Sequence, residues 1–162
     1  MPASSASARP GSHRRRVETG LAEILRKLLS MLEGPPRQAV VIRFTPVKAE
    51  SILERAKKDA RRPEGKGHHT ASVWADVEHT DETRDDLIHR LLELTELHGL
   101  ITEKNPRYWV CTSAGELYDL NFKFEKDGYP GEPDEHYSVV LGNPPDLADA
   151  ERFLSVFRKE ER

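Results

Sequence analysis

The chain contains a single cysteine, Cys111, among its 162 residues. One cysteine excludes an intrachain disulfide and a zinc site built on several cysteines, and it suits a reducing compartment. No apolar run approaches the roughly 18 residues of a membrane-spanning helix, and we read no export signal. These absences predict a cytoplasmic protein that does not bind a membrane.

Two motifs of nucleotide and ester chemistry are also missing. Residues 64–67, Glu-Gly-Lys-Gly, lack the spacing of a Walker phosphate loop, which argues against nucleoside triphosphate hydrolysis, and no serine lies in a nucleophile elbow. Histidine and acidic residues occur at 68–79 and 134–136 without a recognised metal-ligand spacing. A metal site is therefore the minor alternative, and we expect no cofactor.

The composition is poor in hydrophobic residues, at 36%, and rich in charged ones, at 33%. Part of such a chain is expected to lack order, and residues 1–16, rich in Ser, Ala and Arg and free of acidic residues, form the predicted tail. The net charge of −3 argues against a surface that binds duplex DNA by bulk electrostatics. A local site for a small anion stays open.

The segment after the tail, residues 17–34, predicts an amphipathic helix with leucines spaced three or four apart on one stripe. Residues 35–37 contain two prolines and form a predicted linker. The helix must bury its stripe on its own domain, on a second copy or on a partner. Residues 17–34 are therefore a candidate protein-binding segment.

Residues 38–160 predict one α+β domain, in which alternating βα units surround a mainly antiparallel sheet. A strand and then a helix follow each of two histidines, which suggests a duplicated, ferredoxin-like arrangement. The predicted strands are residues 39–44, 68–77, 107–111, 121–126 and 136–141. The predicted helices are residues 47–62, a helix from Thr80 to a stop at Gly99, residues 116–120, and a final helix after Pro145 that includes Phe157.

The most informative pattern is a histidine, any residue, a small hydroxyl residue and an apolar residue, which occurs at 68–71 and again at 136–139. Side chains two apart on a strand share a face. His68 with Thr70, and His136 with Ser138, would each place an imidazole beside a hydroxyl. Two such pairs around one phosphate predict acid/base chemistry on a phosphodiester without a metal, because imidazoles exchange protons near neutral pH.

Three further residues are candidate substrate ligands. Arg43 and Lys123 alternate with apolar residues on their predicted strands and could supply positive charge to the phosphate. Tyr137 could stack a base, as aromatic side chains do in single-strand recognition.

The order of these elements resembles the 2H phosphoesterase superfamily, also called the LigT-like or RNA-ligase-like proteins. A first strand ending in the Phe-Thr-Pro of residues 44–46, a helix and the two histidine motifs follow that family's order across most of residues 38–160. The resemblance implies that one of His68 and His136 is the general base and the other the general acid, while Thr70 and Ser138 donate to the non-bridging oxygens. It implies RNA ends, cyclic phosphates, cyclic nucleotides or short single-stranded RNA as substrates.

The competing interpretation is a non-catalytic interaction module, such as an immunity protein, an adaptor or a regulator. Such a protein would use the helix at 17–34 or the acidic loop at 127–135 to engage another protein. The two interpretations differ in space, because an enzyme needs its histidines to face one site.

Overall fold

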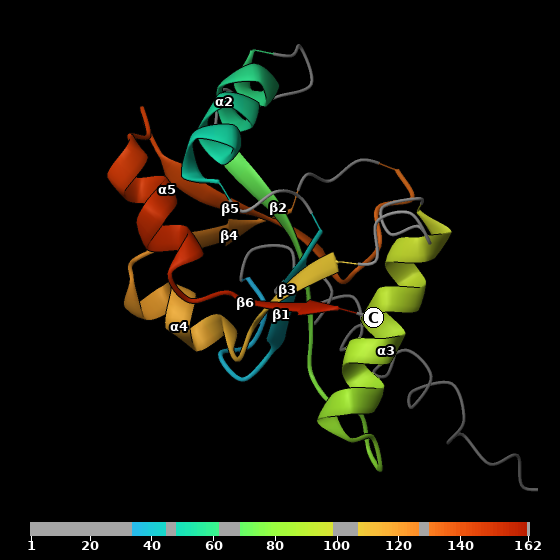
Figure 1. Cartoon of the computed structure of the whole chain (residues 1–162). Coiled ribbons are helices and arrows are strands. Elements are labelled where there is room, and N and C mark those ends of the chain that lie inside the picture. Colours follow the sequence, from blue (N-terminus) through green and yellow to red (C-terminus); the bar gives the residue numbers. More distant parts are fainter. Residues whose placement is uncertain (1–33, 45–47, 62–68, 99–106, 127–129, 162) are drawn as a thin grey trace, which may run out of the picture.

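The computed structural model describes residues 34–44, 48–61, 69–98, 107–126 and 130–161. The strands are β1 Val40–Arg43, β2 His69–Asp76, β3 Arg107–Cys111, β4 Lys123–Glu125, β5 His136–Gly142 and β6 Arg158–Glu161. The helices are α2 Ala49–Ala60, α3 Arg84–Leu97, α4 Ala114–Asp119 and α5 Leu147–Leu154. Within these ranges the strands form one antiparallel sheet in the order β4-β5-β2-β1-β3-β6. The predicted α+β class is confirmed (Figure 1).

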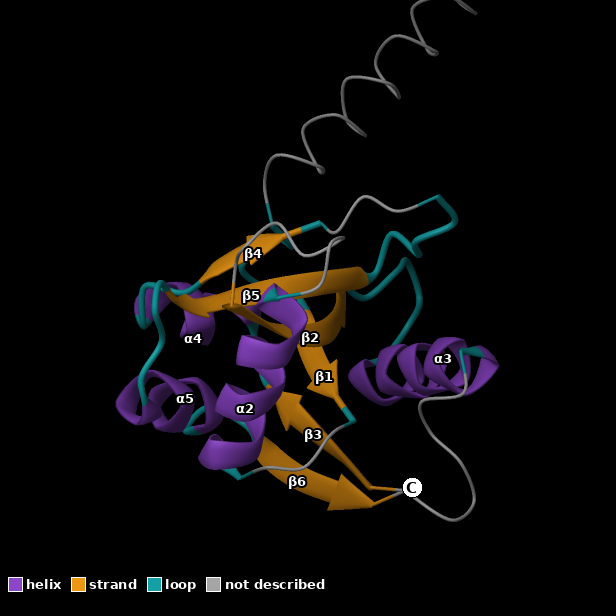
Figure 2. Cartoon of the chain, turned by 90° about the horizontal axis from the view of Figure 1, so that it is seen from above, coloured by secondary structure: helices purple, strands orange, loops and turns teal. Residues whose placement is uncertain are grey.

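Helices cover both faces of the sheet (Figure 2). Phe153 of α5 packs with Val139 of β5 in a cluster to which α2 and α4 also contribute, and we call this side the α5 face. Leu91 of α3 packs with Trp74 of β2 on the opposite side, the α3 face. The helices that follow the two histidine-motif strands therefore cover opposite faces, so the two predicted copies pack differently.

The central strand β1 has apolar side chains on both faces because both faces are covered. Val41 joins the cluster on the α5 face, whereas Val40 and Ile42 join the cluster on the α3 face. All three are buried. The apolar run of residues 39–42 within the predicted strand is thus the signature of a strand buried on both faces.

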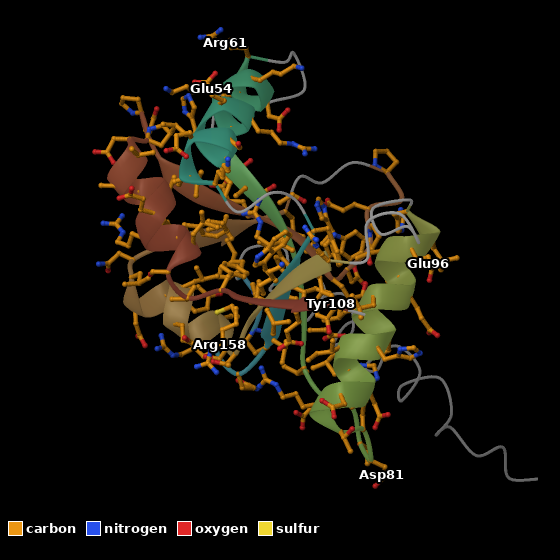
Figure 3. The ribbon with its side chains drawn as sticks, in the orientation of Figure 1. Glu54, Arg61, Asp81, Glu96, Tyr108 and Arg158 are labelled. Carbon is orange, nitrogen blue, oxygen red and sulfur yellow. The ribbon has the colours of Figure 1, made fainter. Side chains whose placement is uncertain are left out.

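Helix α3 begins later than the sequence predicts. The sequence indicates Thr80, but the structure has Thr83 at the cap, where its side chain accepts from the Asp86 amide at 3.2 Å. Asp86 reciprocates by accepting from the Thr83 amide at 3.0 Å, which makes a capping box. Asp81, at the tip of the preceding loop (Figure 3), has φ of 67°. The chain therefore turns between Thr80 and Thr83 before the helix begins.

The C-terminal segment corrects the predicted final helix. α5 starts at a capping box of Asp146 and Asp149 and ends at Leu154, not beyond Phe157. The chain then forms β6, which pairs with β3, and the Tyr108 hydroxyl donates to the Glu160 carboxylate at 3.1 Å. This strand was missed because its four residues are all charged, so they show no alternation of apolar and polar residues.

The predicted linker is fastened to the domain. The Tyr118 hydroxyl donates to the Pro35 carbonyl at 2.8 Å, and the Gly115 amide donates to the Arg37 carbonyl at 2.7 Å. A Cβ on Gly34 would meet Phe124 at 2.5 Å. Residues 34–37 therefore pack on α4 and β4, while the predicted tail and most of the predicted helix at 17–34 lie outside the described residues.

No helix in the described part of the chain is long and apolar enough to cross a membrane.

Candidate active site

The strands that carry the two histidine motifs are direct neighbours. In their register, Thr70 of β2 lies opposite Val140 of β5, and Trp74 of β2 lies opposite His136. Trp74 lies four positions after Thr70 on the strand, a distance of about 13 Å. The pairing is antiparallel, so the starts of the two strands lie at opposite ends of the pair.

The register decides which predicted residues can meet. His68 itself lies outside the described residues, but its neighbour His69 pairs with Gly142, far from His136 along the strand pair. The expectation that the two histidine motifs converge on one phosphate is therefore not supported by this register, because the described start of the first motif lies at the other end of the strand pair from His136. The second motif, by contrast, lies in a well-defined set of contacts.

Three polar side chains form a connected chain at His136. The Oγ of Ser72 lies 2.7 Å from the Nε2 of His136, and the Oε1 of Glu132 lies 2.9 Å from its Nδ1. A carboxylate only accepts hydrogen bonds, so in the neutral imidazole Nδ1–H donates to Glu132 and Nε2 accepts from the Ser72 hydroxyl. We call Ser72, His136 and Glu132 the triad. Its order is that of a nucleophile, a base and a group that orients the base.

Burial differs across the triad in a way that suits chemistry. The Glu132 side chain is 6% exposed and the His136 side chain 11%, whereas Ser72 is an exposed residue. Because burial excludes most of the water around them, the attraction between the imidazole and the carboxylate is stronger than it would be in solvent. The hydroxyl, the outer member, remains accessible to a substrate.

A glycine turn brings Glu132 back toward His136. Gly131 has φ of 84°, a left-handed conformation that favours glycine. The loop is then tied to β2, because the Ala75 amide donates to the Glu135 carbonyl at 2.8 Å. Glu132 thereby reaches the imidazole four residues further along the chain.

Lys126 also holds the loop that carries Glu132. Its ammonium group donates to the His136 carbonyl at 2.7 Å and to the Pro133 carbonyl at 3.3 Å, and it also contacts the Asp134 carbonyl. It lies 3.8 Å from the centre of the Tyr137 ring. These contacts fix the backbone on which the His136 side chain is mounted.

The indole of Trp74 supports the imidazole from the side of α3. Its ring lies 5.3 Å from that of His136 and 5.4 Å from that of His98, which caps the C-terminus of α3. Trp74 is only 3% exposed. The ring therefore limits the freedom of His136 and links the site to α3, and it is too buried to stack a base.

The hydroxyl residues of the two motifs share the α3 face, as predicted. Ser138 lies directly opposite Ser72, and Thr70 lies two residues before Ser72 on the same strand. Side chains at such opposed and diagonal positions are neighbours. On the next strand, Glu125 lies opposite Ser138 and Lys123 opposite Val140. The face thus presents three hydroxyls beside one imidazole, with one exposed lysine at its edge.

The other two predicted ligands lie on the α5 face and are not brought to this site. The Arg43 guanidinium lies 5.2 Å from the centre of the Phe153 ring, and burial, together with the charge of Arg55, lowers its pKa to about 10. Tyr137 packs edge-on against Phe124, and burial raises its pKa to about 12. Contrary to the prediction from the sequence, the structure therefore does not bring Arg43 and Tyr137 to this site, because strand alternation places both on the face opposite Ser138.

Two residues of the triad were missed by sequence reasoning. Ser72 continues the two-residue period of Thr70, so its face could have been predicted, but the register that sets it opposite Ser138 could not. Glu132 precedes His136 by four residues in a stretch without regular structure. Its contact depends on the turn at Gly131, for which the sequence offers only the glycine itself.

A pocket of about 320 Å³ lies elsewhere and includes no member of the triad; its walls are Gln38, Val40, Val77, Glu78, Arg84 and Leu87. Within the described ranges, no group of three histidine, cysteine or acidic side chains could hold a metal ion.

No model of a protein family, no curated protein and no solved structure matches this chain. The resemblance in motif order therefore has no support beyond the residues themselves.

Proposed function

We propose that this protein is a phosphoesterase in which His136 moves protons to and from a phosphodiester without the help of a metal ion. The observation that carries the proposal is the oriented imidazole: Glu132 fixes Nδ1–H, which leaves Nε2 directed at the Ser72 hydroxyl on the α3 face. A positioned imidazole is an efficient proton carrier near neutral pH.

The remaining residues of the face have assigned roles in this proposal. Thr70 and Ser138 donate to the non-bridging oxygens of the phosphate, where negative charge increases during the reaction. Lys123 supplies a positive charge from the edge strand β4. RNA ends, cyclic phosphates, cyclic nucleotides and short single-stranded RNA all present a phosphodiester or its cyclic equivalent and form the substrate class.

The charges near the site favour a diester over a monoester. Glu132 belongs to the triad, and Glu125 lies on the strand next to Ser138. Two carboxylates repel a phosphomonoester, which carries nearly two negative charges at neutral pH, more than a diester, which carries one. We therefore expect no turnover of simple phosphomonoesters.

The role of His68 is changed in this proposal. Because His69 pairs with Gly142 at the far end of β2 and β5, a mechanism with one histidine fits the described residues better than one with two. His68→Gln is expected to change turnover by less than about threefold, an effect far below the 10²–10⁴ of a positioned acid or base.

The proposal is tested by incubating the purified chain with 2′,3′-cyclic nucleotides and with 2′-5′ and 3′-5′ linked dinucleotides, in the presence and absence of a chelator. Turnover should occur both with and without the chelator, and His136→Gln should lower the turnover rate by about 10²–10⁴. The matched control is His89→Gln, because His89 is an exposed histidine on α3 that pairs with Glu93. Turnover that survives in His136→Gln would contradict the proposal.

The interaction module is the other outcome of this experiment. If the wild-type chain is inert toward the whole panel, the proposal fails. A pull-down that captures a protein partner with the full chain, and not after deletion of residues 17–33, would then be positive evidence for the module.

A further inference from the structure

We propose that Ser72 is the nucleophile of this site and that the reaction passes through a phosphoserine diester on its Oγ. The proposal rests on the proposed function, since it names the group that attacks the phosphorus. It replaces water with a residue of the chain in the first step, and the observation behind it is the contact between Ser72 and His136.

Geometry singles out Ser72 among the hydroxyls of the α3 face. Its Oγ lies 2.7 Å from the Nε2 of His136, the distance of a strong hydrogen bond to a base. Ser72 is exposed, whereas Ser138 on the opposing strand is 3% exposed. The hydroxyl that contacts the base is thus also the more accessible of this opposed pair.

The substrate can approach because the described apolar contacts of α3 end short of Ser72. In the described part of the chain, the buried cluster under α3 includes Trp74 of β2 and no earlier residue of that strand. Ser72 lies one step beyond Trp74 on the same face. Trp74 therefore lies on one side of Ser72 along β2 and Thr70 on the other, while Ser138 lies directly across from it on β5.

The first step transfers a phosphoryl group to the serine. The Ser72 hydroxyl proton moves to Nε2 of His136 while Oγ forms a bond to phosphorus. The bond from phosphorus to the leaving oxygen breaks, and that oxygen takes the proton from Nε2, so the first alcohol departs and His136 is neutral again. Glu132 stabilises the transient imidazolium through Nδ1–H.

The second step releases the product by hydrolysis. Water gives a proton to Nε2 while its oxygen bonds to phosphorus, the bond between phosphorus and Oγ breaks, and Oγ regains a proton from the imidazolium. A phosphodiester and water become an alcohol and a phosphomonoester. For a 2′,3′-cyclic phosphate the leaving oxygen stays attached through the ribose, so ring opening and hydrolysis occur on one molecule.

The test uses diisopropyl fluorophosphate, which reacts with an activated serine by losing fluoride and leaves a stable phosphoryl ester. Intact-mass spectrometry of the full chain should show one added diisopropylphosphoryl group, and peptide mapping should place it on Ser72. Labelling should be absent in Ser72→Ala and slower by about 10²–10⁴ in His136→Gln, since the base activates the nucleophile.

The matched controls are Ser155→Ala, which removes an exposed serine at the end of α5 outside the site, and His89→Gln, which removes a distant histidine. Both should keep labelling within about threefold of wild type. The mapped position in the wild-type chain decides the question even if a variant fails to fold. A label on Ser138 or on another residue, or no label at all, would overturn the proposal.

Failure of this inference can be separated from failure of the proposed function. Turnover of phosphodiesters that depends on His136, without labelling of Ser72, would leave the phosphoesterase intact and make water the nucleophile. Labelling of Ser72 that depends on His136, without turnover of any phosphodiester, would establish the nucleophile and refute the substrate class.

Discussion

The two faces of β2 and β5 differ completely in chemistry although they belong to the same strands. On the α5 face the strands contribute Ala71, Val73, Ala75, Tyr137, Val139 and Leu141 to the apolar cluster. On the α3 face the same strands present Thr70, Ser72, Trp74, His136, Ser138 and Val140. One face is a helix-covered core, and the other combines a core at Trp74 with a polar site.

This difference separates stability from chemistry along a single pair of strands. The α5 face carries the ring cluster of Phe153, whose side chain has no exposed area. The α3 face carries buried polar groups, which cost free energy unless they are hydrogen-bonded. The triad meets that condition through its two contacts. Substitutions on the α5 face should therefore mainly lower stability, whereas substitutions on the α3 face should mainly lower activity.

The largest effect is expected from Phe153→Ala on the α5 face. The ring packs 5.1 Å from that of Phe157 and 5.7 Å from that of Phe122, so its removal leaves a cavity. We expect a loss of about 3–5 kcal/mol in the free energy of unfolding, measured with urea. In the folded fraction at low temperature, labelling of Ser72 should persist. Finding a loss below 1 kcal/mol would show that this face is not the main core.

A smaller loss of stability and a larger loss of activity are expected from Glu132→Ala on the α3 face. The change leaves the largely buried Nδ1 of His136 without its acceptor, which costs about 1–3 kcal/mol. Phosphodiester turnover and Ser72 labelling should both fall, and Glu132→Gln, which keeps an acceptor oxygen, should retain more of each. Glu93→Ala, at an exposed carboxylate of α3, is the control. Equal activity in Glu132→Ala and wild type would break the distinction between the two faces.

The contrast between faces could be predicted from the sequence, because it depends only on alternation along a strand. The two-residue period set Thr70 with Ser72 and His136 with Ser138, and the apolar residues between them marked the opposite face. The spacing of apolar residues three or four apart in the two helices likewise indicates that Leu91 and Phe153 face the core, and both have no exposed area.

The composition of the site could not be predicted, because it depends on which strands pair and in which direction. Direct antiparallel pairing of β2 with β5 sets His136 against Trp74 and separates it from Thr70. In a parallel pair the two strands would start at the same end, so the two histidine motifs would lie side by side. The contact of Glu132 with His136 depends on a turn outside regular structure, and Arg43 was misplaced because its strand is covered on both faces rather than one.

The corrected start of α3 gives a third test, which concerns how the helix of the α3 face is held. Thr83→Ala removes the cap that bonds to Asp86 and should cost about 1 kcal/mol. Thr80→Ala removes the threonine that the sequence indicated and should change the free energy of unfolding by less than about 0.5 kcal/mol. Urea titration of the two variants compares them directly. Equal effects of the two substitutions would contradict the assignment of Thr83 as the residue that caps α3.

The smallest effect concerns the ion pairs that join the first turns of α3 to the end of β2. Arg90 donates to Glu82 at 2.8 Å and to Asp76 at 2.7 Å. The hydrogen bond from Arg90 is the main cause that lowers the pKa of Glu82 to about 2, with a further contribution from the His79 amide.

A carboxyl group whose pKa is lower in the folded than in the unfolded chain stabilises the fold above its unfolded pKa. That contribution is lost as the pH falls through the folded value. The melting temperature of wild type should therefore exceed that of Glu82→Gln above about pH 5, since the ordinary pKa of glutamate is about 4.3, and the difference should shrink toward pH 2. The difference should be small because Glu82 is only partly buried, so that water still screens its ion pair with Arg90. Glu78→Gln, an exposed glutamate nearby, should show no such trend, and a gap that widens toward pH 2 would contradict the assigned role of Arg90.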